Sequence, residues 1–179
     1  IHNGSIIIDD VEDSGELRRG RPCTHKLFGT DIAINAGNFL YFLPLLIFTK
    51  STERFNNETT LRIYEIYAQE MIKIHAGQAL DIWWHKGKEE SRTEEQYLQM
   101  CAYKTGTLAR MAARMAVALC GGSLEQEEKI GRMAETIGIA FQIQDDILDI
   151  VSSGKERERF GKSFGNDIKE GKRTLMVIY

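Results

Sequence analysis

The sequence predicts an all-α fold, and three observations support that prediction. Only 2 of the 179 residues are proline, and 42% are hydrophobic, enough for one domain with a sizeable core. Few β-branched residues alternate with polar ones in the way that strands require. Two segments, Thr93–Gln96 and Ser123–Gln126, have the pattern of capping boxes that open helices.

The expected elements follow one another with short breaks. Helices are expected over residues 1–14, 30–49, 59–85, 93–120 with a pause near Gly106, 123–151, and from 172 onward; loops are expected over residues 15–29, 86–92 and 152–171. Within the uncharged run 32–49, Asn35, Asn38 and Pro44 favour a kinked core helix over a membrane span. We expect one all-helical domain over residues 1–179, incomplete at both ends, because the chain begins and ends inside apparent helices.

Charge and cysteine content argue against several other classes of protein. The net charge of −3 gives no support to nucleic-acid binding. The three cysteines, Cys23, Cys101 and Cys120, are far apart and odd in number, which favours reduced thiols over a disulfide framework. No basic-then-apolar leader is visible at the start of the chain. We therefore expect a cytoplasmic protein without a transmembrane segment.

A D-D-x-x-D segment lies near the end of the first expected helix. Asp9 and Asp13 are one turn apart, so their carboxylates share a face, with Asp10 beside them. These acids repel one another and face the negative end of the helix dipole, so a cation should offset both effects. Mg²⁺ takes carboxylate oxygens and keeps phosphates as other ligands, while Arg18 and Arg19 suit phosphate oxygens. The segment predicts a metal–diphosphate site; the alternative is a solvated acidic helix face.

The same pattern recurs at Asp145, Asp146 and Asp149, near the end of another apolar helix. With Gln142 these residues fall at i, i+3, i+4 and i+7, which makes one polar stripe. Each acidic motif is followed by a basic loop. Two such motifs predict facing acidic helices that hold several Mg²⁺ around one diphosphate, in preference to two acidic surface patches.

With these motifs, the chain resembles the trans-isoprenyl diphosphate synthases (polyprenyl synthetases) over essentially all its length. The resemblance includes the two acidic motifs and further segments that match the family's R-R-G, G-Q-x-x-D, K-T-x and lysine-bearing motifs: residues 18–20, 77–81, 104–106, 161–162 and 171–174. Residues 2–5 and 41–43 most resemble the eukaryote-like geranylgeranyl branch. The insertion-like run 155–159 departs from the pattern; we assign the loop lysine to Lys162 because Gly161 precedes it and Asp167 follows.

The resemblance implies an isoprenoid synthase helical bundle around a central cavity, a homodimer, and Mg²⁺ as cofactor. It implies direct metal ligation by Asp9, Asp13 and Asp145, with Asp10, Asp146 and Asp149 ligating or acting through waters. The allylic diphosphate would be held by four basic residues, Arg18, Lys104, Lys162 and Lys172, while Arg19 would face isopentenyl diphosphate. The orienting residues would be Gln78, Asp81, Thr105 and Gln142.

The chemistry that the resemblance implies has three steps. Metal and basic side chains stabilise the leaving diphosphate, so the carbon–oxygen bond breaks to an allylic cation. The double bond of isopentenyl diphosphate attacks that cation, and a proton is then lost. The resemblance implies a catalytic set of eight residues: Asp9, Asp10, Asp13, Arg18, Lys104, Asp145, Asp146 and Lys162.

Helix geometry suggests the product. If the diphosphate is held at Asp9, its tail runs back toward Ile1, and one helical turn of about 5.4 Å approximates one isoprene unit. Gly4 and Ser5 are small and would leave a channel open, while Tyr41, Phe42 and His75 match the residues that floor the cavity in the geranylgeranyl branch. We expect geranylgeranyl diphosphate, lengthened by cutting the floor residues to Ala and shortened by Gly4→Phe or Ser5→Phe.

Other functions remain open on the sequence alone. These are a farnesyl or longer-chain synthase, a class I terpene cyclase, and a non-catalytic synthase subunit. A cyclase would normally replace the second acidic motif with an Asn/Asp-Ser/Thr-Glu type of site and would not need Arg19. The intact acidic motifs argue against a non-catalytic subunit. We also expect the segment alone to be inactive and poorly folded, because helices facing the cavity would lose packing partners.

Overall fold

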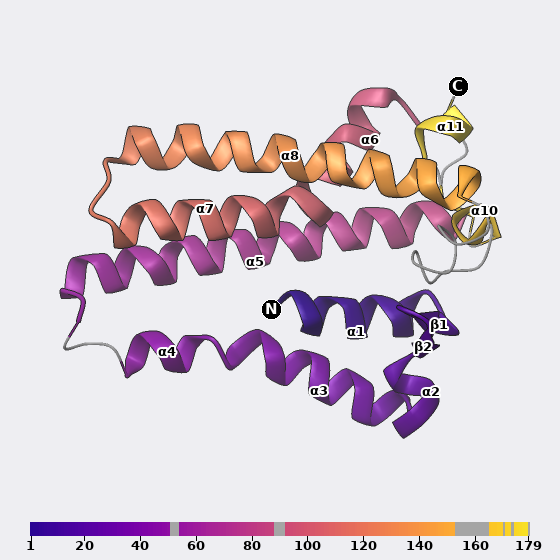
Figure 1. The fold of residues 1–179 in the computed structure, drawn as a ribbon, viewed down its shortest axis with the longest axis horizontal. Helices are drawn as coiled ribbons and strands as arrows, with labels where there is room; N and C mark the ends of the chain where they lie inside the picture. The colour runs from indigo at the N-terminus through magenta and orange to yellow at the C-terminus, as the bar shows by residue number, and fades with distance from the viewer. Residues whose placement is uncertain (51–53, 88–91, 153–164, 170, 173, 179) are drawn as a thin grey trace. The chain divides into compact units, whose positions relative to one another are not determined.

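The structure, a computed structural model, describes residues 1–50, 54–87, 92–152, 165–169, 171–172 and 174–178. Contacts divide the chain into two compact units, residues 1–50 with 148–170 and residues 51–147 with 171–179. Helices make up nearly all of the described elements, as the sequence predicts (Figure 1). The prediction of a single domain over residues 1–179 stays a prediction.

The first unit contains the first acidic motif and a short hairpin. Its elements are α1 (His2–Glu12), β1 (Leu17–Arg18), β2 (Arg21–Pro22), α2 (Thr24–Phe28), α3 (Thr30–Phe42), α4 (Leu45–Thr49) and α10 (Asn166–Lys169). The prediction of a plain loop over residues 15–29 is wrong, because that stretch holds both strands and α2. Helix α1 ends two residues before the expected boundary at residue 14, and Ser14 itself, with φ of 54°, has a left-handed conformation.

The hairpin displays the predicted Arg-Arg-Gly segment. Arg18 pairs with Arg21 across the two strands, and the two residues between them, Arg19 and Gly20, have φ of 54° and 74°. Positive φ at both central residues is the conformation of a type I′ turn, which glycine adopts without steric cost. Arg19 therefore lies exposed at the hairpin tip, whereas Arg18 lies in the strand beside α1.

Helices α1 and α3 meet through two glycines. A Cβ on Gly4 would lie 2.8 Å from the carbonyl oxygen of Gly37 and 3.0 Å from Cβ of Leu40. A Cβ on Gly37 would lie 2.7 Å from Ile8 and 3.1 Å from the carbonyl oxygen of Gly4. The missing side chains thus let two helix backbones touch. Gly4 is buried against α3, so the explanation that it keeps a channel open is wrong.

One described stretch, Thr30–Thr49, is long and apolar enough to cross a membrane by length and composition alone, with mean hydropathy 1.6. Core helices of soluble proteins pass the same test. The kink predicted at Pro44 is confirmed, because α3 ends at Phe42 and α4 begins at Leu45. Only 17% of the stretch is buried in the described chain, so its predicted burial is not confirmed.

The second unit is built around long helices that lie along one another (Figure 1). Its elements are α5 (Asn57–His85), α6 (Glu94–Cys101), the π-helical turn η1 (Ala102–Gly106), α7 (Thr107–Leu119), α8 (Leu124–Val151), whose last turn belongs to the first unit, and α11 (Leu175–Ile178). Both predicted capping boxes are confirmed: Gln96 N donates to Thr93 Oγ1 at 3.3 Å and Gln126 N donates to Ser123 Oγ at 3.2 Å. The pause predicted near Gly106 is the π turn.

A small apolar core joins α5, α6 and α8 of this unit. Its buried members are Trp84, Tyr97, Met100 and Cys101, with Ile139 and Ile143 among the apolar residues packed on them. The three cysteines are free, as predicted. Burial raises the pKa of Cys101 to about 12, whereas Cys120, at the end of α7, is exposed.

We predict that Gly4→Ala in the full-length protein lowers the free energy of unfolding by about 1–3 kcal/mol, because the new Cβ collides with backbone rather than with a movable side chain. Ser5→Ala, one residue along the same helix, should change it by no more than about 0.5 kcal/mol. Thermal or urea unfolding measures both. Equal stability of the two variants would show that α1 and α3 are not in backbone contact.

Candidate active site

The first acidic motif is held by an arginine of the hairpin. Asp10 is 3% exposed, and its Oδ1 accepts hydrogen bonds from Nε and Nη2 of Arg18 at 2.8 and 2.6 Å. Nη2 also lies 3.5 Å from Oδ2 of Asp9. The sequence required a cation to offset repulsion among these acids, and Arg18 supplies one.

Two pKa values follow from this arrangement. Burial lowers the pKa of Arg18, but its hydrogen bond to Asp10 and the charges of Asp10 and Asp9 more than offset that effect and raise it above its ordinary value. Burial, together with the charge and hydrogen bond of Asp10, raises the pKa of the neighbouring Cys23 thiol to about 11. Arg18 stays a cation, and Cys23 stays a protonated thiol at neutral pH.

The second acidic motif is held by neutral donors. Asp146 is 4% exposed; its Oδ2 accepts from the Tyr97 hydroxyl at 2.5 Å and its Oδ1 from Nε2 of Gln142 at 2.8 Å. Burial and the adjoining Cys101 and Asp146 raise the pKa of Tyr97, so its hydroxyl keeps the proton that it donates. Asp149, in the first unit, is fully buried and its Oδ2 accepts from the backbone N of Asp167 at 3.2 Å.

Burial thus separates the six aspartates into two groups. Asp10, Asp146 and Asp149 are buried and accept hydrogen bonds from the protein. Half-buried are Asp9, Asp13 and Asp145, the residues predicted to ligate metal directly. Asp9 and the pair Asp145–Asp146 belong to different units, so the predicted approach of the two motifs stays a prediction.

The chemistry of the half-buried carboxylates fits Mg²⁺. Among the described residues no three His, Cys, Asp or Glu side chains are grouped as a complete metal site. Mg²⁺ does not need one, since it binds through one or two carboxylates plus waters and substrate phosphates. Asp9 and Asp13 come from consecutive turns at the end of α1, with Asp13 as its C-cap, and offer two hard oxygen ligands.

The turn η1 contains two predicted site residues, Lys104 and Thr105, which contact different helices. Lys104 forms an ion pair with Asp81 on α5 through Nζ and Oδ2, and both side chains are mostly buried. Thr105 donates its hydroxyl hydrogen to Oε1 of Gln142 on α8 at 2.6 Å. Through Gln142, Thr105 is joined to Asp146, so the structure connects the predicted K-T-x segment with the second acidic motif.

Glycines bring the backbones together around η1. A Cβ on Gly77 would lie 2.3 Å from N of Lys104 and 2.6 Å from C of Tyr103. A Cβ on Gly138 would lie 2.6 Å from Cα of Gly106. Because these contacts are with backbone, no side chain can be accommodated without shifting the turn. The glycine of the predicted G-Q-x-x-D segment therefore serves packing beside Lys104.

The other predicted substrate-binding residues are placed as follows. Arg19 is exposed at the hairpin tip, Gln78 is half-buried on α5, and Lys172 is half-buried just before α11. Lys162 lies outside the described residues. None of these positions tests a role in binding.

The predicted chain-length residues fall in both units. Tyr41 lies beside Gly4, with its Cδ1 3.5 Å from the place of a Cβ there, and Ser5 donates to the carbonyl oxygen of His2 at 2.9 Å. Phe42 is 66% exposed in the described chain. His75 is on α5 of the second unit, with Nδ1 2.7 Å from the carbonyl oxygen of Met71. A common floor formed by Tyr41, Phe42 and His75 stays a prediction.

Sequence patterns did not reveal the part played by Tyr97. It lies on α6, far along the chain from the acidic motif, and nothing in its local pattern distinguishes it from a core aromatic. A buried hydroxyl normally finds a partner, but the partner is set by tertiary packing.

Solved structures define the class of protein as an all-α isoprenoid synthase. The chain superimposes with a TM-score of 0.84 on the geranylgeranyl pyrophosphate synthetase of the archaeon Geoglobus acetivorans, at 35% identity over 99% of this chain and 53% of that one. A polyprenyl synthase from Caulobacter crescentus, complexed with calcium and isoprenyl diphosphate, gives a TM-score of 0.83 at 27% identity, over 99% of this chain and 50% of that one.

The chain belongs to the polyprenyl synthetase family, whose model matches residues 1–179. It is 34% identical over 180 residues to a geranylgeranyl pyrophosphate synthase of Rhodocybe pseudopiperita, covering 100% of this chain and 50% of the relative. The chain thus spans about half the length of the curated relatives it matches. The predicted family and fold are confirmed.

We predict that Tyr97→Phe lowers the free energy of unfolding by about 1–3 kcal/mol, because a buried carboxylate loses a donor. Turnover should fall as well, because Asp146 lies next to Asp145 in the acidic motif. Tyr64→Phe, a half-buried tyrosine on α5, is the control and should change both less. Wild-type stability and turnover in Tyr97→Phe would mean that the hydroxyl does not hold Asp146.

Proposed function

We propose that the protein is a Mg²⁺-dependent trans-prenyltransferase that condenses isopentenyl diphosphate with an allylic diphosphate. One observation carries the proposal: the hydrogen bonds Thr105–Gln142–Asp146 join the second acidic motif to the turn that bears Lys104. A metal-binding carboxylate motif and a diphosphate-binding lysine must be neighbours to act on one leaving group. Membership of the polyprenyl synthetase family supports the same chemistry.

In this proposal each group has a defined task. Asp9, Asp13 and Asp145 hold Mg²⁺, which when bound supplies positive charge beside the leaving diphosphate. Arg18, Lys104, Lys162 and Lys172 bind the allylic diphosphate, and Arg19 binds that of isopentenyl diphosphate. The buried carboxylates of Asp10, Asp146 and Asp149 orient their neighbours. The similar polyprenyl synthase of Caulobacter crescentus is complexed with calcium and isoprenyl diphosphate, which supports a site that takes a divalent cation and a diphosphate together.

Arg18 has two partners in this proposal. Its guanidinium contacts Asp10 and Asp9, and it is also assigned to the diphosphate. The five donors of a guanidinium allow it to keep one carboxylate while it binds a phosphate oxygen. The arginine thereby links the acidic motif to the substrate and holds both in one orientation.

We propose geranylgeranyl diphosphate as the main product and a homodimer as the active form. The similarity to geranylgeranyl pyrophosphate synthases supports this product over farnesyl or longer chains. The second acidic motif and Arg19 are both present, which favours a synthase over a terpene cyclase. A cytoplasmic location is part of the same proposal and rests on the sequence alone.

We expect Asp9→Ala or Asp145→Ala in the full-length protein to lower turnover of isopentenyl and allylic diphosphates well beyond tenfold, because each removes a metal ligand. Stability should change little, because each of these half-buried carboxylates lies beside another aspartate of its own motif, and its removal relieves that repulsion. Glu12→Ala, which removes an exposed acid of α1, is the control for lost charge. Retention of more than about a tenth of wild-type turnover at saturating Mg²⁺ would contradict direct ligation.

Product chromatography tests the chain-length residues. Tyr41→Ala, Phe42→Ala and His75→Ala should lengthen the product, because each removes bulk from the proposed cavity floor, and Ser5→Phe should shorten it to farnesyl diphosphate. Gly4→Phe is unsuitable, because Gly4 packs on the backbone of α3 and the bulky side chain would disrupt that contact. The same product from all four variants would remove these residues from the site.

A further inference from the structure

The π turn η1 is an uncommon conformation that carries Lys104, a proposed diphosphate ligand, and Thr105, a predicted orienting residue. Isolated π turns are rare and occur mostly inside α-helices, often at functional sites. Lys104 and Thr105 both lie in this one, between α6 and α7. The direction of their side chains depends on the turn staying wide, because reversion to an α-helix would rotate each of them about the helix axis.

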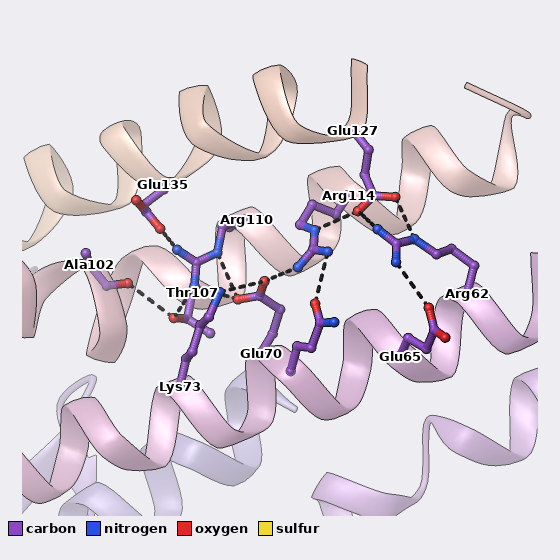
Figure 2. A network of polar contacts seen from close by, with 11 residues as sticks. Arg62, Glu65, Glu70, Lys73, Ala102, Thr107, Arg110, Arg114, Glu127 and Glu135 are labelled. Carbon is purple, nitrogen blue, oxygen red and sulfur yellow. Dashed lines mark hydrogen bonds and ion pairs between the residues drawn. The ribbon is translucent and has the colours of Figure 1, made fainter. Parts of the chain in front are cut away.

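A threonine hydroxyl spans the turn. Thr107, the first residue of α7, is fully buried and donates its hydroxyl hydrogen to the carbonyl oxygen of Ala102 at 3.2 Å, five residues earlier. In an ordinary α-helix a threonine hydroxyl reaches the carbonyl four residues back. The five-residue spacing matches the π turn, so this bond joins its two ends (Figure 2).

An arginine orients that hydroxyl. Nη2 of Arg110 donates to Oγ1 of Thr107 at 3.2 Å, which occupies an acceptor site of the hydroxyl and directs its hydrogen toward Ala102. Arg110 is in turn fixed by Glu70 on α5, whose Oε2 accepts from Nε at 2.9 Å and from Nη2 at 2.7 Å. Glu70 is fully buried.

The same carboxylate belongs to a network that joins three helices. Glu70 also pairs with Arg114 on α7 and lies 3.8 Å from Nζ of Lys73. From α8, Glu127 accepts from Arg114 and Glu135 pairs with Arg110 (Figure 2). The four basic residues, Arg62, Lys73, Arg110 and Arg114, are matched by four glutamates, Glu65, Glu70, Glu127 and Glu135. The positive and negative charges of these eight residues are therefore equal in number. Arg110 is held from α5 by Glu70 and from α8 by Glu135.

We propose that Thr107, oriented by Arg110 and Glu70, is a positioning residue that keeps η1 open and so directs Lys104 toward the allylic diphosphate. The inference rests on the proposed function, because it takes Lys104 as a diphosphate ligand. Thr107 does not touch the substrate in this scheme. It acts only through the width of the turn.

The alternative is that the network acts only on the packing and stability of the helices and has no effect on the direction of Lys104. Thr107→Val separates the two, since it removes the hydroxyl and keeps the shape of the side chain. Thr107→Ser restores the hydroxyl. Thr136→Val is the matched control, because Thr136 donates to the carbonyl oxygen of Arg132 at 3.0 Å, four residues back, within ordinary α-helix.

The experiment compares these variants in the full-length protein by steady-state kinetics and hydrogen exchange. In Thr107→Val we expect the KM for the allylic diphosphate to rise about tenfold, as for one weakened charged contact, with the KM for isopentenyl diphosphate nearly unchanged. Backbone amides of residues 103–110 should exchange faster in the substrate-free protein. Thr107→Ser and Thr136→Val should behave like wild type in both measurements.

Two results would overturn the positioning role. One is wild-type KM and exchange in Thr107→Val. The other is a uniform loss of activity and of melting temperature that Thr107→Ser does not restore, which is the pattern of a purely structural residue. If the wild-type protein transfers no prenyl group, the proposed function fails instead, and the exchange of residues 103–110 alone decides whether Thr107 holds the turn.

Discussion

Close backbone contact around η1 is the constraint on which the second unit depends. Gly77 on α5 and Gly138 on α8 leave room for the turn, and a Cβ on either would meet backbone atoms. Because the turn is enclosed from both helices, Lys104 can pair with Asp81 and Thr105 can reach Gln142. The directions of the Lys104 and Thr105 side chains are thus set by the absence of side chains at Gly77 and Gly138 as much as by the contacts that they make.

The two acidic motifs are supported by different physical means. Asp10 accepts a hydrogen bond from the charged guanidinium of Arg18, whereas Asp146 accepts hydrogen bonds from the neutral side chains of Tyr97 and Gln142. An anion can compete with a carboxylate for a guanidinium, whereas a buried hydrogen bond to a neutral donor offers it no charged partner. The first motif therefore depends on a charged partner, whereas the described partners of Asp146 are neutral donors.

Much of the fold was predictable because its signals are local. Capping boxes at Thr93 and Ser123, and the break at Pro44, are set by neighbouring residues and are confirmed. Gly4 was misinterpreted because a small residue suits both a channel and a helix crossing, and only tertiary contacts distinguish them. The contacts of Tyr97 with Asp146 and of Glu70 with Arg110 could not be predicted, because their partners lie far along the chain and are set by tertiary packing. The spacing of Arg110 and Arg114, two like charges one turn apart on an apolar helix, was a usable sign that a buried acid faces them.

The three thiols differ in a way that matters for handling the molecule. Cys23 and Cys101 are buried, and their raised pKa values leave almost no thiolate at neutral pH, whereas Cys120 is exposed at the junction of α7 and α8. Electrophiles react with thiolate, so within this chain they select Cys120. Cys120 is therefore an attachment point for a fluorophore or spin label at the end of α7 opposite to η1, where a reporter can follow the helices of the second unit.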